Sequence, residues 1–398
     1  MRQITIIYIV LFFSYTATAQ HTVQLSPTVF LGVSTNIETY FFVEKLAVER
    51  IDNFVFDIKS TDYSHQPIVF FGYKHFQQYQ NDPLIIRAAN ILKQLRDSLH
   101  DNGPIMEYLL NQKEFPATGA RFTGINSDLL NNRAPAKFKS LLAELTDSLR
   151  KFYIHRNVAG FLDSNASFYR GAINEVAKDV NKSAFSFMEK WYGKKFPQYE
   201  LYISPAMPIT PGEDSYRGFG PQILSSKGII PSMMVSSSKM LQIQDGLSKY
   251  KQFGFDNPAV TRFIFYHETM HSFVNPLLEK YSTQIKADSA LFTKSLKDIL
   301  SPHYISDWTV CLTEHLVRLG EIRIAVSMNN NVEADRLRKL HITEYKCVLI
   351  PILEQKIKEY EADRANYQDF ESYLPKLISF FHTLSIKVID EQVAKYGK

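Results

Sequence analysis

The amino-acid sequence predicts an α+β protein in which helices dominate and a small mixed sheet accompanies them. Three observations support this fold class. In the first half of the chain, apolar residues recur at three- and four-residue spacing over long stretches, which is the pattern of amphipathic helices. After Tyr192, two short strand-like runs flank a loop rich in proline and glycine. From Asn257 onward, the helical spacing returns.

The composition is typical of a packed globular protein. The chain has 398 residues, of which 45% are apolar and 13% aromatic, enough for one large core or two smaller ones. Its net charge of +4 is small for this length, and basic residues alternate with acidic ones, so we expect no nucleic-acid partner. Cys311 and Cys347 are the two cysteines, which excludes a disulfide framework and leaves either one bridge or two buried free thiols.

The N-terminus has the three-part plan of a secretory signal peptide. Arg2 precedes an apolar run from Ile4 to Phe13, and Ala17-Thr18-Ala19 follows. We therefore predict a signal peptide over residues 1–19 and a periplasmic or secreted protein. The apolar run is shorter than the roughly 20 residues that a membrane-spanning helix needs, and no later stretch approaches that length. We expect no stable membrane insertion after cleavage.

Residues 20–192 are predicted to form an N-terminal, mainly helical α+β region. Its first part mixes strand-like runs with a helix-like run, and three amphipathic stretches follow. The expected strands are Val29–Val33 and Phe54–Ile58, and the expected helices are Ile37–Ala47, Pro83–His100, Ala136–Val158 and Asn165–Tyr192.

Residues 193–398 are predicted to form a second region that packs with the first as one unit. Strands at Tyr199–Ser204 and Ile229–Ser236 flank the loop between Pro205 and Pro231, which is the best candidate for a functional loop. Because proline cannot donate to a neighbouring strand, Pro231 predicts a sheet edge for the second strand. The four helices expected after this strand are Asn257–Asn275, Ser306–Met328, Arg336–Ala362 and Tyr367–Val393.

The first of these helices carries the motif His267-Glu268-Thr269-Met270-His271. Asn257 and Pro258 provide a cap and a first helical residue. Histidines four residues apart on a helix can bring two imidazole nitrogens onto one zinc ion, and Glu268 is then placed to act on water beside the metal. The alternative is a pair of core histidines satisfied by hydrogen bonds, with Glu268 on the solvent side.

A catalytic zinc normally has three protein ligands. On the expected helix Ser306–Met328, Glu314, Arg318 and Glu321 share one face. We choose Glu314 as the third ligand, with His315 and Glu321 as competitors, and expect Arg318 to orient the Glu314 carboxylate or to bind substrate. The alternative is that Glu314 and Arg318 form an ordinary exposed pair of little energetic weight.

These residues resemble the gluzincin branch of zinc peptidases, in which two motif histidines and a glutamate on a later helix bind zinc. Over most of the mature chain, the sequence also resembles a family of exported, zincin-like bacterial proteins defined as a domain of unknown function. The cues are Val33–Glu38, the extension of the motif through His271–Pro276, and Glu314 followed by Arg318.

The resemblance implies a zincin-like fold, with the small sheet beside the motif helix and residues 193–398 as the zinc-binding catalytic region. It implies Zn²⁺ at His267, His271 and Glu314, with Glu268 as general base. It also implies an edge strand before the motif helix, placed at Ile229–Ser236, to which an extended substrate adds by β-pairing. The group that polarises the carbonyl stays open among Tyr304, His303, His315 and Arg318.

The sequence therefore predicts an exported zinc metallohydrolase, specifically a peptidase acting on a peptide or protein substrate. Glu268 is its expected base and later proton donor. The alternative function is an exported binding or scaffold protein that keeps a zinc site without proteolytic activity. The complete motif argues against this alternative, because a purely structural zinc site does not require Glu268.

Overall fold

The structure is a computed structural model, and it describes residues 22–51, 53–54, 57–96, 102–122, 136–209 and 215–397. The predicted signal peptide, residues 1–19, lies outside this part of the chain. Within it, helices dominate and one small mixed sheet is present, so the predicted α+β class is confirmed. No helix among these residues is both long enough and apolar enough to cross a membrane.

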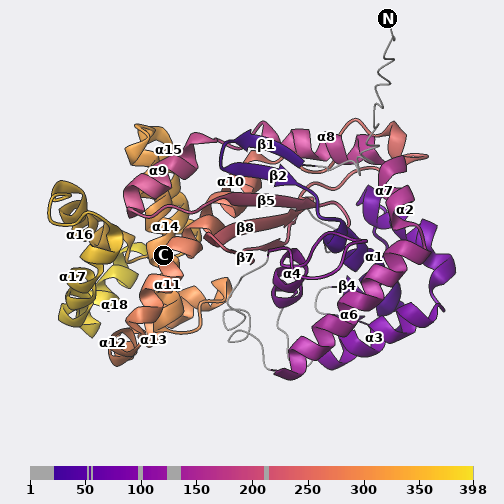
Figure 1. The fold of residues 1–398 in the computed structure, drawn as a ribbon. Coiled ribbons are helices and arrows are strands. Elements are labelled where there is room, and N and C mark those ends of the chain that lie inside the picture. Colours follow the sequence, from indigo (N-terminus) through magenta and orange to yellow (C-terminus); the bar gives the residue numbers. More distant parts are fainter. Residues whose placement is uncertain are drawn as a thin grey trace, which may run out of the picture.

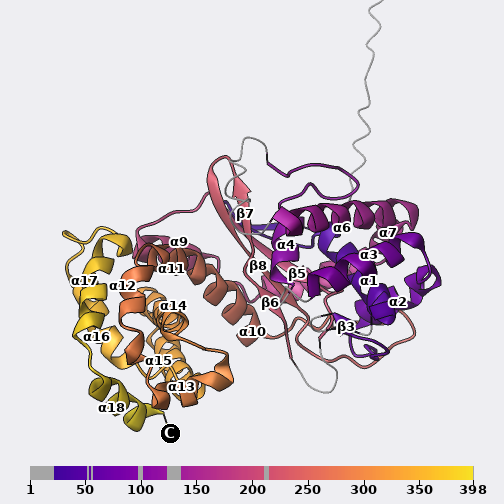
Figure 2. The same ribbon diagram turned by 90° about the horizontal axis from the view of Figure 1, so that it is seen from below.

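The sheet lies in the middle of the molecule, between two groups of helices (Figures 1 and 2). Its strand order is β1-β2-β5-β8-β6, and β7 also pairs with β8. The central strands β2, β5 and β8 are parallel to one another, whereas β1, β6 and β7 are antiparallel to their neighbours. The strands are β1 (Thr22–Ser26), β2 (Val29–Gly32), β5 (Tyr199–Ser204), β6 (Gly218–Phe219), β7 (Gln222–Ser225) and β8 (Gly228–Ser236).

The prediction that the strand containing Pro231 lies at a sheet edge was wrong. β8 pairs with β5 on one side and with β6 and β7 on the other. Proline fits there because pairing with β5 begins one residue later, at Ser232, whose backbone N–H bonds to the Pro221 carbonyl on the opposite side. The N–H that Pro231 lacks would therefore point past the end of the β5 ladder.

The helices α2, α3, α4 and α6 pack around α1, which is buried along most of its length, whereas α9 packs against α14 and α17. The predicted helix over residues 165–192 is broken at residues 178–182, between α8 and α9. In place of one strand at residues 54–58, the structure has two short strands, β3 (Asn53–Phe54) and β4 (Asp57–Ile58), which pair antiparallel outside the main sheet. The helices are α1 (Thr35–Ile51), α2 (Pro67–Phe76), α3 (Pro83–Arg96), α4 (Gly103–Leu110), α6 (Ala136–His155), α7 (Val158–Ser164), α8 (Ala166–Ala177) and α9 (Ser183–Tyr192).

The C-terminal helices lie on the other side of the sheet (Figure 2). Two helices predicted as continuous are each broken. The first is interrupted at residues 345–349, after a wide π-turn, and the second at Leu384–Ser385, where the Ser385 side chain caps a new helix. The helices are α10 (Pro258–Arg262), α11 (Glu268–Lys280), α12 (Ser282–Ala287), α13 (Lys294–Leu300), α14 (Trp308–Ser327), α15 (Asn331–Lys339), α16 (Ile350–Ala362), α17 (Phe370–Thr383) and α18 (Ile386–Tyr396).

Two hydrophobic cores hold these layers together, one beneath each group of helices. Alternating residues of β8 point to opposite faces of the sheet, so Met233 belongs to one core and Met234 to the other. Each core also contains residues from both sides of position 192. The sheet therefore contributes one face to each core. The motif helix packs against the sheet through contacts of α11 and the preceding turn with β8.

Candidate metal centre

The motif lies on a helix that changes its winding at the first histidine. The Asn257 side chain caps α10 by accepting from the Val260 N–H, and Pro258 stands at the first turn, as the sequence predicts. The segment Phe263–His267 (η3) is a π-turn, and α11 continues from Glu268. Such wide turns are rare and occur frequently at functional sites.

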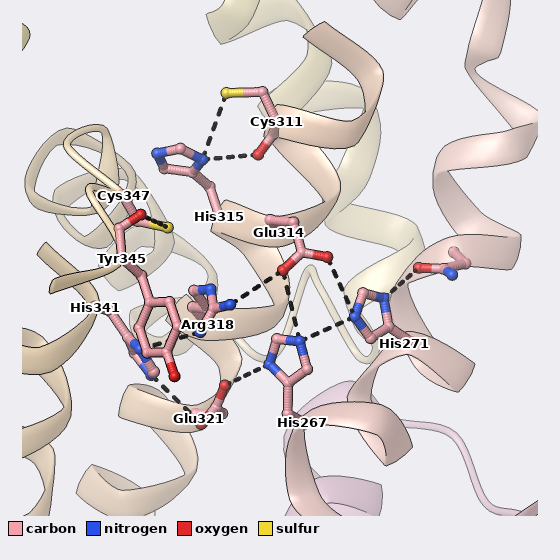
Figure 3. Close-up of polar contacts among 11 residues, drawn as sticks. His267, His271, Cys311, Glu314, His315, Arg318, Glu321, His341, Tyr345 and Cys347 are labelled. Atoms are coloured by element: carbon pink, nitrogen blue, oxygen red, sulfur yellow. Dashed lines mark hydrogen bonds and ion pairs between the residues drawn. The ribbon is translucent and has the colours of Figure 1, made fainter. Parts of the chain in front are cut away.

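The two motif histidines and Glu314 face one another (Figure 3). His267 Nε2 lies 3.2 Å from His271 Nε2. Glu314 comes from α14, with one carboxylate oxygen 3.5 Å from His267 Nε2 and the other 3.5 Å from His271 Nε2. The structure therefore brings together the three residues predicted as ligands.

A glycine allows the two helices that carry these residues to approach. Gly320 on α14 faces α9 and α11, and a Cβ atom added there would lie 2.4 Å from Tyr192 Oη and 3.1 Å from Met270 Sδ. A larger side chain at this position would push α14 away from α11. The Glu314 carboxylate would then move away from the histidines.

The geometry of the three groups fits a zinc ion. Zinc binds histidine nitrogen and carboxylate oxygen at about 2.0–2.2 Å, so tetrahedrally placed donors lie about 3.3–3.6 Å apart. The measured separations are 3.2, 3.5 and 3.5 Å. Two imidazole nitrogens that face each other at this distance also need a proton or a cation between their lone pairs. The donor set, two nitrogens and a carboxylate, is one that zinc accepts.

Each histidine is held from behind through its second nitrogen. His267 Nδ1 lies 2.8 Å from Glu321 Oε1, and His271 Nδ1 lies 3.0 Å from Asn275 Oδ1. With a proton on each Nδ1, the Nε2 atoms are left free to bind a metal. The Phe263 ring stacks on the His267 ring at a centroid distance of 4.7 Å, which further fixes its orientation.

Arg318 lies one turn after Glu314 on α14 and is buried, not on an exposed helix face. Its Nη2 atom is 3.5 Å from Glu314 Oε2. The guanidinium carbon lies 4.0 Å from the centre of the Tyr345 ring, so the cation rests against an aromatic face. Arg318 is thus placed to orient the Glu314 carboxylate.

The charges of this cluster shift the pKa values of its members. Burial alone would raise the pKa of Glu314, but the hydrogen bond from His267 and the charges of His267, His271 and Arg318 lower it to about 2. Burial lowers the pKa of His267, whereas Glu314 and Glu321 outweigh this effect and raise it to about 9. Glu314 is therefore an anion at neutral pH, and a metal ion competes with a proton for His267.

Glu268 faces a cavity beside the end strand of the sheet. The cavity has a volume of about 350 Å³ and is lined by β6, the adjoining Gly220 and Pro221, and Gly103 and Glu107 of the N-terminal helices. A Cβ atom on Gly220 would lie 3.0 Å from Glu268 Oε2, so a side chain at this position would crowd the carboxylate. Glycine here allows backbone and carboxylate to line one cavity.

The comparison with family models covers this whole arrangement. The model of a family described as a domain of unknown function (DUF4932) matches residues 29–380, from β2 into α17. The chain belongs to the DUF4932 family. No curated protein and no solved structure matches it.

The other candidates named from the sequence are not members of the metal cluster. His315 is buried but points away from the histidine pair, with Nδ1 2.7 Å from the Cys311 carbonyl (Figure 3). Glu321 contacts His267 through Nδ1, the nitrogen on the far side from Glu314. Tyr304 is 94% exposed. Cys311 and Cys347 are buried free thiols, so of the two alternatives the structure shows no bridge.

Sequence reasoning missed two residues that lie beside the metal cluster. Tyr345 supports Arg318, and His341 contacts both Glu321 and Arg318. His341 lies in the π-turn Leu340–Glu344 (η6) and Tyr345 directly after it, in a stretch predicted to be regular helix. His341 has no partner at ligand spacing in the sequence, so no local signal identifies it. Asn275 was named only as part of the His271–Pro276 extension. Its contact with His271 could have been predicted, because residues four apart on a helix lie on the same face.

Proposed function

We propose that this protein is an exported zinc-dependent metallohydrolase, and within that class a peptidase. The observation that carries the proposal is the cluster of His267, His271 and Glu314 at zinc-compatible separations. Glu268, the residue directly after His267, supports a catalytic site over a purely structural one. Its carboxylate lines a cavity beside the sheet.

A zincin-like architecture is part of this proposal. The motif helix packs on β8 of a small mixed sheet, and the third carboxylate comes from a later helix, α14, that packs against α11. This arrangement agrees with the gluzincin pattern that the sequence resembles. The agreement concerns the geometry around the motif, and it supports assigning the remaining gluzincin role, that of general base, to Glu268.

The residues of the chain then have distinct roles. His267, His271 and Glu314 would hold zinc, which when bound supplies a positive charge that acidifies water and polarises a carbonyl. Glu268 takes the proton of the attacking water and later passes it to the leaving amine. Glu321 and Asn275 hold the two imidazoles in the orientation that binding requires.

The sheet edge supports an extended peptide as the substrate. β6 is the end strand next to Glu268 in the sheet. The adjoining strand β7 is covered, because Asn111 and Glu107 of the α4 region bond to its backbone. Because β8 is paired on both sides, it cannot accept a further strand. We infer instead that a substrate strand would pair with the backbone of Gly218–Gly220.

Two measurements on the purified protein test the proposal. Elemental analysis should find about one zinc per chain, and His267→Ala should lose it. A peptide-library assay should detect hydrolysis that Glu268→Gln lowers by about 100- to 10,000-fold, the range for loss of a general base. Glu279→Gln, an exposed change on the same helix, is the matched control and should retain both zinc and activity.

The outcomes separate the candidate functions. Zinc binding together with hydrolysis that depends on Glu268 supports the peptidase. Zinc bound at full stoichiometry with no hydrolysis of any library peptide would overturn the peptidase and favour a scaffold that keeps a metal site. Absence of zinc after reconstitution would overturn both.

A further inference from the structure

His341 lies behind the metal centre and is completely buried. It belongs to the π-turn η6, more than 70 residues after His267 in the chain. Its Nε2 atom is 3.4 Å from Glu321 Oε2, which is a polar contact although the hydrogen-bond geometry is poor. On the other side of the ring, Nδ1 is 3.5 Å from Arg318 Nη1.

The two residues that His341 touches each contact a different ligand. Glu321 uses its other oxygen to hold His267, at 2.8 Å from Nδ1. Arg318 uses its other terminal nitrogen to reach Glu314, at 3.5 Å. His341 thus closes a chain of polar contacts that begins at one proposed ligand and ends at another (Figure 3).

The chemistry of imidazole suits this position. A carboxylate accepts hydrogen bonds and a guanidinium donates them, so a group between them must donate on one side and accept on the other. Imidazole does this from two nitrogens on opposite sides of a rigid ring. Glu321 and Arg318 are each only 7% exposed, so either side chain left without its neighbour would carry a poorly compensated buried charge.

The backbone at His341 is shaped for the same contacts. Like His267, it lies on a wide π-turn. This turn and the residue after it present two rings to Arg318: His341 through Nδ1, and Tyr345 through its face, 4.0 Å from the guanidinium carbon. π-turns are rare, and two of them converge on one cluster of polar side chains.

We propose that His341 is a positioning residue that fixes the orientation of His267 and Glu314 by holding Glu321 and Arg318 apart at a set distance. The proposal rests on the proposed metal site, because it concerns how two of the proposed ligands are oriented. It assigns a role to a histidine that makes no contact with the metal cluster itself.

Zinc affinity, measured by competition with a chromophoric chelator, tests this role. His341→Leu removes both polar contacts and should weaken zinc binding by about 10- to 100-fold, the range for residues that orient ligands. His341→Gln can still donate from its amide nitrogen and accept at its oxygen, so it should recover most of the affinity. Circular dichroism and thermal unfolding verify that each variant folds.

His315 supplies a matched control. It is also fully buried, and it lies on α14 directly beside Glu314, but its ring bonds to the Cys311 carbonyl. His315→Leu removes a comparable buried imidazole and should leave zinc affinity within about threefold of wild type. Cobalt substituted for zinc gives a second readout, since its visible absorption spectrum reports ligand geometry. It should change in His341→Leu and return in His341→Gln.

These results distinguish failure of the positioning role from failure of the proposed function. Wild-type protein that binds neither zinc nor cobalt would overturn both. Metal binding in wild type with unchanged affinity and spectrum in His341→Leu would overturn the positioning role alone. Equal losses in His341→Leu and His315→Leu would also overturn it, because loss of core packing would then account for the effect.

Discussion

Glu38 in α1 and Glu321 in α14 are both buried glutamates, one among the N-terminal helices and the other behind the metal centre. Burial dominates at Glu38 and raises its pKa to about 7, even though three hydrogen bonds oppose the shift. Burial would also raise the pKa of Glu321, but the adjacent imidazoles of His341 and His267 hold it well below its usual range.

The partners explain the difference. Glu38 accepts hydrogen bonds from the Ser204 hydroxyl, the Tyr169 phenol and the Ala206 backbone N–H, and none of these donors is charged. Glu321 lies between two imidazoles and near Arg318. A buried carboxylate stays ionised when cationic partners offset the cost of removing it from water. Glu321, as an anion, can accept a strong hydrogen bond from a histidine of the proposed metal site, whereas Glu38 joins α1 to the segment at the end of β5.

The largest effect should come from removing the charge that faces the histidines. Glu314→Gln keeps the side-chain shape but loses the anionic oxygen donor. We expect zinc affinity to fall by on the order of a thousandfold or more, beyond the 10- to 100-fold typical of residues that only orient ligands. Chelator competition measures this change, and Glu279→Gln on α11 is an exposed control. An affinity equal to wild type would remove Glu314 from the ligand set.

Glu38 should make the free energy of unfolding depend on pH. The folded protein binds the Glu38 proton more tightly than the unfolded chain does. The resulting stabilisation is fully present below pH 4.5 and is lost as the pH rises to about 7. At about 1.36 kcal/mol per pKa unit, the loss reaches about 3 kcal/mol at most.

Glu38→Gln should flatten this slope, because an amide does not titrate and the Ser204 hydroxyl can rotate to accept from it. Urea unfolding at several pH values between 4.5 and 8 measures the free energy of unfolding. The variant should gain stability relative to wild type as the pH increases. A slope that stays the same as in wild type would assign the pH dependence to another group.

At the metal centre, Glu321→Gln tests charge separately from shape. The amide oxygen can still accept from His267 Nδ1, but the negative charge that strengthens this bond is absent. We expect zinc affinity to fall by about 10- to 100-fold. Isothermal titration with a competing chelator checks this value. If affinity were unchanged, the hydrogen bond and not the charge would be what Glu321 contributes.

The sequence predicted the parts of this arrangement that local rules govern. Strand β5 was predicted with the bounds that the structure has, and Glu314 lies with His267 and His271 as the helical spacing suggested. The break around residues 345–349 and the position of His341 were not predicted. Apolar spacing continues through the break, and the prediction of one continuous helix passed over a local signal, Pro351, which is the second residue of α16. The position of His341 depends instead on contacts between residues far apart in the chain.

The prediction that β8 is an edge strand was wrong for a related reason. Proline correctly signalled a missing ladder bond, but whether that bond points to solvent or past the end of a neighbour depends on register. Register between β5 and β8 is set by the whole sheet. The motif and the contact of His271 with Asn275 follow from helical spacing, whereas the contact of His267 with Glu321 required the fold.

The smallest effect should come from Asn275, which holds His271 as Glu321 holds His267. Asn275 is exposed and uncharged, so water can replace its oxygen when the side chain is removed. Asn275→Ala should therefore weaken zinc binding by less than about tenfold, measured by the same chelator competition. A loss as large as that of Glu321→Gln would show that orientation of the imidazole, not a buried charge behind it, determines the affinity, and the contrast between the two buried glutamates would then not explain the metal centre.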